Sequence, residues 1–122
     1  MVTSFLAATA TKVAVYILLR VYFTVFGIKT LETLPVEELL LAMGLIAIVL
    51  MSTVAIYQND VKRLLAYSSI AQIGYMVIGI SMFTASGLTA TIIHLFNHAL
   101  MKAALFLALA SIFYRIKSVN IK

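Results

Sequence analysis

The chain has 122 residues, of which 64% are hydrophobic and only 11% are charged, and its mean hydropathy is +1.13. A soluble domain usually carries about 25% charged residues, so this composition excludes an ordinary soluble fold and predicts an integral membrane protein. The net charge is +5, but the basic residues form no continuous stripe, so no nucleic-acid partner is expected. The absence of cysteine excludes disulfides and thiolate chemistry.

Four apolar runs are each long enough to cross a bilayer, and they predict an all-α membrane fold of about four antiparallel transmembrane helices. Residues 1–122 are expected to form a single transmembrane segment. Its four runs cover roughly residues 2–26, 36–57, 61–83 and 88–114. The breaks carry suitable residues: Pro35 fits a first helical turn, and Asp60 is expected to cap the third helix. Short connections of this kind predict antiparallel neighbours.

The first run is not expected to be a cleaved signal peptide. It lacks a basic region ahead of the apolar residues, it is longer than a typical signal core, and it carries Lys12 and Arg20. Five of the nine basic residues lie near Asp60 or in the C-terminal tail, on the side of the membrane that also holds Met1. The positive-inside rule therefore places both termini in the cytoplasm. We expect a multi-pass protein of a prokaryotic-type inner membrane.

The fourth run contains a row of three ionisable side chains, His94, His98 and Lys102, at intervals of four residues. Each helical residue advances about 100°, so the three lie within a stripe of roughly 80° on one face. A lysine at the centre of a bilayer helix costs roughly 2.5–3.5 kcal/mol, so the row is expected to face protein or water. Neighbours four residues apart lie about 6 Å apart, a gap that one bridging water can span. Because histidine exchanges protons near physiological pH, the row predicts a proton or ion relay.

Other interpretations apply to individual residues. A single buried histidine would indicate packing rather than transport, and only the three groups together favour a relay. The His94–His98 spacing also occurs in zinc sites, but no glutamate lies between them and no third ligand is evident, so no metal site is predicted. For Lys12, the residues alone leave open a lysine that extends to the membrane edge or a buried functional amine. Small and polar residues of the third run suit close helix packing more than transport.

All four acidic residues lie in loops or at helix ends: Glu32, Glu37, Glu38 and Asp60. The sequence therefore supplies no carboxylate within a span to balance Lys12, Lys102 or the histidines. Buried cations are normally paired or neutralised. We expect the missing carboxylates to come from other helices, which makes this chain a fragment or one piece of a larger membrane assembly.

Three stretches resemble one family of membrane proteins. They are residues 8–20 around Lys12, residues 58–75 with the run Asp-Val-Lys-Arg-Leu-Leu-Ala-Tyr-Ser-Ser, and residues 94–106 with the His-x3-His-x3-Lys block. In this order and spacing they are similar to the proton-conducting antiporter-like subunits. These include the large membrane subunits of respiratory complex I, the D-type subunit of Mrp-type Na+/H+ antiporters, and subunits of membrane-bound hydrogenases. The context of Lys12 and the Phe-Asn-His block are closer to the D-type branch.

The resemblance implies roles for individual residues. Lys12 matches a central lysine that links two half-channels, and His94, His98 and Lys102 match positions along a hydrated central axis. The resemblance also implies that a discontinuous helix with a Lys-x-Pro break and a helix with an intramembrane glutamate precede this segment. A second discontinuous helix is expected to follow it.

We therefore predict translocation of protons, with Na+/H+ exchange as a second candidate, through a relay of Lys12, His94, His98 and Lys102. The chain carries no catalytic chemistry of its own, although a redox-driven complex similar to NADH:quinone oxidoreductase can contain such a subunit. Expected partners are other membrane subunits or flanking helices, the lipid bilayer, and H+ or Na+; no cofactor is expected. Supporting polar or packing roles are assigned to Tyr16, Lys62, Ser68, Ser69, Gln72 and Asn97.

The alternative function belongs to a different class. A truncated or split chain could pack in the complex as a structural element without conducting ions. The integrity of the polar axis separates the two hypotheses, because an intact axis favours descent from a working channel. The presence of Lys12, His94, His98 and Lys102 favours the translocating function.

Overall fold

The computed structural model describes residues 2–27, 33 and 35–116. Over these residues the chain forms α1 (Val2–Arg20), which continues into the π-helical segment η1 (Val21–Phe26), then α3 (Val36–Ile56), α4 (Val61–Ser81) and α5 (Ala85–Ile116). In this part of the chain, four helices are long and apolar enough to cross a membrane. The predicted all-α membrane fold is confirmed.

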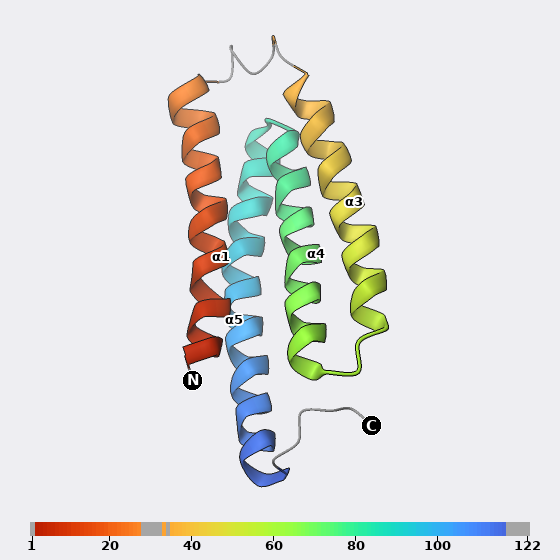
Figure 1. Cartoon of the computed structure of the whole chain (residues 1–122). Helices are drawn as coiled ribbons and strands as arrows, with labels where there is room; N and C mark the ends of the chain where they lie inside the picture. The colour runs from red at the N-terminus through yellow and green to blue at the C-terminus, as the bar shows by residue number, and fades with distance from the viewer. Residues whose placement is uncertain (1, 28–32, 34, 117–122) are drawn as a thin grey trace.

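Successive helices run in opposite directions (Figure 1). The turn between α3 and α4 lies at the same end of the bundle as the start of α1, and the turn between α4 and α5 lies at the other end. α5 is the longest of the described helices, and it extends past its neighbours at the end of the bundle that holds the α3–α4 turn. In the packing, α3 contacts α4 most extensively, while α5 lies against both α1 and α4.

Side-chain caps explain where two of the helices begin. Asp60 has an extended backbone, and its carboxylate accepts a hydrogen bond of 2.8 Å from the backbone N–H of Lys62. The predicted N-cap of α4 is thereby confirmed, and such caps contribute about 1 kcal/mol. At the start of α5, Thr84 Oγ1 accepts a hydrogen bond of 3.1 Å from the N–H of Gly87. This second cap lets α5 begin at Ala85, three residues before the expected start at residue 88.

The end of the first span differs from a simple α-helix. From Val21 to Phe26 the backbone is π-helical, which the apolar pattern of the sequence does not reveal. Aromatic contacts hold this segment against the α4–α5 turn. The ring centroids of Tyr22 and Phe23 lie 6.4 and 6.1 Å from that of Phe83. These contacts join the first span to the α4–α5 hairpin at one end of the bundle.

Two glycines allow α3 and α4 to approach closely. Gly44 and Gly74 are both buried where the helices cross. A Cβ atom on Gly74 would lie 2.9 Å from the carbonyl oxygen of Gly44, and a Cβ on Gly44 would lie 3.0 Å from that of Gly74. Small residues permit such backbone-to-backbone packing between membrane helices. This packing places α4 directly against α3, and α4 supplies several residues of the site described below.

Candidate functional site

The predicted row on α5 faces the interior of the bundle over most of its length. His98 is 0% exposed and Lys102 is 3% exposed, while His94 is half-buried. The imidazole rings of His94 and His98 are nearly parallel, with an interplanar angle of 8° and a centroid separation of 6.2 Å. This stacking follows from the four-residue spacing, which brings side chains one above the other on a helix.

Lys102 is held by α4 through two uncharged oxygen atoms. Its Nζ donates a hydrogen bond of 2.8 Å to the backbone carbonyl oxygen of Leu65 and one of 3.3 Å to Ser68 Oγ. Carbonyl and hydroxyl dipoles partly replace the water that a buried ammonium group loses. Among the described residues, the amine is therefore held by a carbonyl and a hydroxyl dipole.

Lys12 brings a second amine to the same region from another helix. It is 6% exposed and lies on the buried face of α1 together with Val15 and Leu19. α1 packs against α5, the helix that carries His98 and Lys102. This burial argues against one of the two interpretations that the sequence left open, a side chain at an exposed membrane edge.

Several histidine nitrogens have no protein hydrogen-bond partner in the described part of the chain. They are both ring nitrogens of His98 and Nε2 of His94. Buried polar groups are nearly always hydrogen-bonded, so such atoms are exceptions that call for an explanation, and a role in chemistry is one of the recognised ones. A neutral imidazole presents one N–H donor and one acceptor nitrogen, which is the combination that a proton relay needs.

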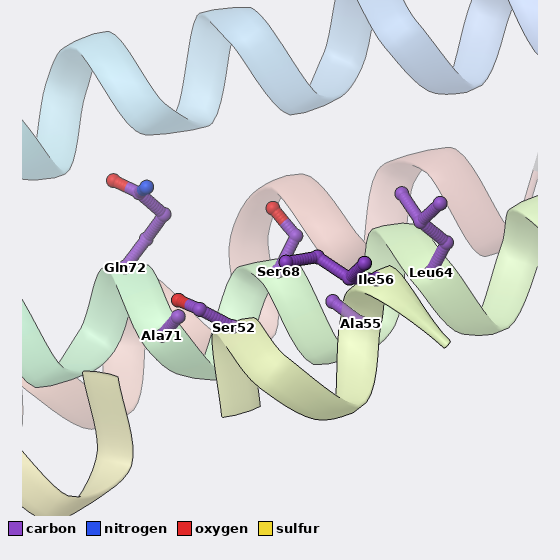
Figure 2. A pocket seen from close by; sticks show the side chains of 7 residues that line it. All are labelled: Ser52, Ala55, Ile56, Leu64, Ser68, Ala71 and Gln72. Atoms are coloured by element: carbon purple, nitrogen blue, oxygen red, sulfur yellow. The ribbon is translucent and has the colours of Figure 1, made fainter. Parts of the chain in front are cut away.

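Two cavities flank the row on its α4 side. One has a volume of about 280 Å³ and lies between α3 and α4; Figure 2 shows its lining residues, with Ser68 and Gln72 pointing from α4 toward the ribbon of α5. The other has a volume of about 490 Å³, lies between α4 and α5, and is lined by Gln72, Tyr75, Gly79, Ala90, Thr91 and His94. Gln72 borders both cavities. Each volume exceeds the roughly 30 Å³ that one water molecule occupies in the liquid.

The expected supporting residues lie in different places. Ser68 and Gln72 face the row or its cavities, whereas the Ser69 hydroxyl donates a hydrogen bond of 2.8 Å to the Leu65 carbonyl within α4. Lys62 is exposed, and its Nζ lies 5.1 Å from the ring centroid of Phe113. Tyr16 and Asn97 are also exposed, on faces of α1 and α5 beside the buried ones.

Three contributors were missed from the sequence. The Leu65 carbonyl is a backbone group, so no residue type indicates it. Tyr75 packs edge-on against His94, with centroids 6.1 Å apart. Thr91 Oγ1 lies one helical turn before His94 and is 3.3 Å from the Met76 carbonyl oxygen and 2.9 Å from that of Gly87. Thr91 precedes His94 by three residues, so extending the row of His94, His98 and Lys102 toward the start of α5 would have identified it.

Over residues 2–27, 33 and 35–116, no group of three or more metal-binding side chains comes together.

A family model described as "NADH:quinone oxidoreductase/Mrp antiporter, TM" matches residues 1–122. NADH-quinone oxidoreductase subunit N of Desulforudis audaxviator is 40% identical over 108 residues, which are 86% of this chain and 21% of that protein. NADH-quinone oxidoreductase subunit L of Buchnera aphidicola is 39% identical over 106 residues, 87% of this chain and 16% of that protein. F(420)H(2) dehydrogenase subunit L of Methanosarcina mazei is 46% identical over 67 residues, 52% of this chain and 10% of that protein. The chain spans at most 21% of the length of these three relatives. No solved structure matches it.

Proposed function

Since this chain belongs to the family of transmembrane subunits shared by NADH:quinone oxidoreductase and Mrp antiporters, we propose that it moves protons through a buried relay of lysine and histidine side chains. The relay consists of Lys12, His94, His98 and Lys102. The observation that carries this proposal is Lys102, an amine buried within a membrane-spanning helix whose hydrogen bonds go to a carbonyl and a hydroxyl oxygen. Ionisable residues placed inside a membrane commonly mark ion pathways.

The two lysines suit an alternating mechanism. Lys12 and Lys102 are buried on helices that pack against each other, so a positive charge on one amine disfavours a positive charge on the other. Arrival of a proton at one lysine therefore promotes release from the other. The Leu65 carbonyl and the Ser68 hydroxyl stabilise the charged state of Lys102 until its proton leaves.

The segment works as part of a larger assembly in this proposal. The described acidic residues support this: Glu37 and Glu38 are exposed in the first turn of α3, and Asp60 caps α4 at a membrane edge. Carboxylates that balance the relay would then belong to other helices of the complete subunit or to neighbouring subunits. Protons are the proposed substrate, with Na+ as a further candidate for exchange.

Removing the Lys12 amine is expected to slow proton transport on the order of 100-fold, because positioned acid–base groups contribute factors of that size. The measurement is proton uptake by vesicles containing the complete complex with Lys12→Ala. Arg115→Ala is the control, since it removes one positive charge from an exposed position at the end of α5. Full transport by the Lys12 variant would favour the structural alternative, in which the chain packs without conducting.

The proposed orientation places both chain termini and the α3–α4 turn in the cytoplasm of a prokaryotic-type cell. Asn59 lies in the α3–α4 turn and Ser86 in the first turn of α5, and both residues are exposed. Cysteines introduced at these two positions are expected to react with a membrane-impermeant maleimide from opposite sides. Asn59→Cys should react from the cytoplasmic side. Ser118, in the basic tail, lies outside the described residues. Labelling of both cysteines from one side would contradict the topology.

A further inference from the structure

One polar side chain, Gln72, lines both cavities on the α4 side of the row. The first cavity reaches Lys102 through Ser68, which lines that cavity and also accepts the Lys102 hydrogen bond. The second cavity reaches His94, which forms part of its wall. Ser68 and Gln72 therefore place polar side chains along α4 at the two cavities, between Lys102 and His94.

The direct path along α5 is less suitable for the same transfer. His98 lies between Lys102 and His94 in the sequence, but it is 0% exposed and is absent from the linings of both cavities. Its ring centroid lies 6.2 Å from that of His94, with the rings stacked rather than joined edge to edge. Stacked rings direct their nitrogens outward within their own planes, so they do not hydrogen-bond to each other.

Building on the proposed function, we propose that protons pass between Lys102 and His94 along α4, through water held at Ser68 and Gln72. In this step one N–H bond breaks at Lys102 Nζ and one forms at a ring nitrogen of His94, which lines the second cavity. Each intervening water or hydroxyl oxygen gains one proton and passes one on, so the connecting groups are unchanged.

Ser68 has the hydrogen bonds that this step requires. While its oxygen accepts from Lys102, the hydroxyl retains its own O–H to donate into the cavity. The neighbouring Ser69 differs, because its hydroxyl donates to the Leu65 carbonyl within α4 and it lines neither cavity. Two adjacent serines on one helix therefore provide a matched comparison.

Cysteine reactivity tests for water independently of transport. In the complete complex, in a background without other reactive cysteines, Ser68→Cys and Gln72→Cys are expected to react with a small water-soluble thiosulfonate reagent. Ser69→Cys is expected to react at least about tenfold more slowly, since the thiolate forms only where water reaches it. Equal protection of positions 68, 69 and 72 would show that the route is dry and would overturn the inference.

Transport measurements separate this inference from the proposed function. Ser68→Ala and Gln72→Leu are expected to slow proton uptake about five- to tenfold, the effect of losing one or two hydrogen-bond partners. Ser68→Thr should retain most activity because it keeps the hydroxyl. The control Ser111→Ala removes an exposed hydroxyl that bonds within α5, and it should transport normally. Normal transport by the Ser68 and Gln72 variants, with Lys102→Ala impaired, overturns only the α4 route. Normal transport by Lys102→Ala overturns the proposed function and the route together.

Discussion

Proton transport should fall on the order of 100-fold when Lys102 is replaced by alanine in the complete complex, because the substitution removes a positioned group that takes up and releases protons. Assembly should remain largely normal. Lys102→Ala leaves the Leu65 carbonyl without the lysine, but this oxygen still accepts from the Ser69 hydroxyl, and no buried charge is left unpaired. Proton uptake by reconstituted vesicles measures the first effect, and native gel electrophoresis of the complex measures the second.

The arginine variant separates charge from proton exchange. Lys102→Arg keeps a positive charge, but a guanidinium group stays protonated under all ordinary conditions and cannot release its proton. We therefore expect Lys102→Arg to be impaired as well. If Lys102→Arg transports at the unsubstituted rate while Lys102→Ala does not, the side chain acts as a fixed charge rather than as a relay member. If both variants transport normally, Lys102 is not on the proton path.

The residue pattern predicted the fold and the main row because both depend on periodicity. Four apolar runs of bilayer length became four helices, and the four-residue spacing placed His98 and Lys102 on the buried face of α5. It was harder to predict which residues of α1 share the buried face of the helix with Lys12. Tyr16 lies four residues after Lys12, yet it is 56% exposed, because the buried stripe of α1 passes through Val15 and Leu19 instead. A helical wheel gives the angles between side chains but not the centre of the contact with the neighbouring helix.

The partners of the row could not be predicted in the same way. Lys102 bonds to the carbonyl oxygen of Leu65, and every residue has such a carbonyl, so no sequence signal distinguishes this one. Its availability depends on how close α4 lies to α5. Ser68, by contrast, was recognised as a polar residue of the third span but interpreted as packing, since only the geometry shows that it contacts Lys102 and a cavity. Contacts between helices distant in sequence were the part that required the structure.

The substitution Gly74→Leu should destabilise the protein by about 3 kcal/mol, at the upper end of the cost of overpacking a tight contact. A Cβ at this position would lie 2.9 Å from the Gly44 carbonyl oxygen and from Ile48 Cγ1, and 3.3 Å from Ala47 Cβ. The backbone oxygen cannot rotate away as a flexible side chain can, so α3 and α4 must separate. Thermal unfolding of the detergent-solubilised complex measures the loss.

A leucine added elsewhere on α4 provides the control for Gly74→Leu. Ala66 is exposed on the same helix, so Ala66→Leu adds a leucine side chain away from the contact with α3 and should change the unfolding temperature little. An unfolding temperature for Gly74→Leu equal to that of the control would contradict the close-packing argument. Because α4 also carries Leu65 and Ser68, its displacement should loosen the hydrogen bonds to Lys102. Transport and stability should therefore decline together in Gly74→Leu, whereas Lys102→Ala loses transport alone.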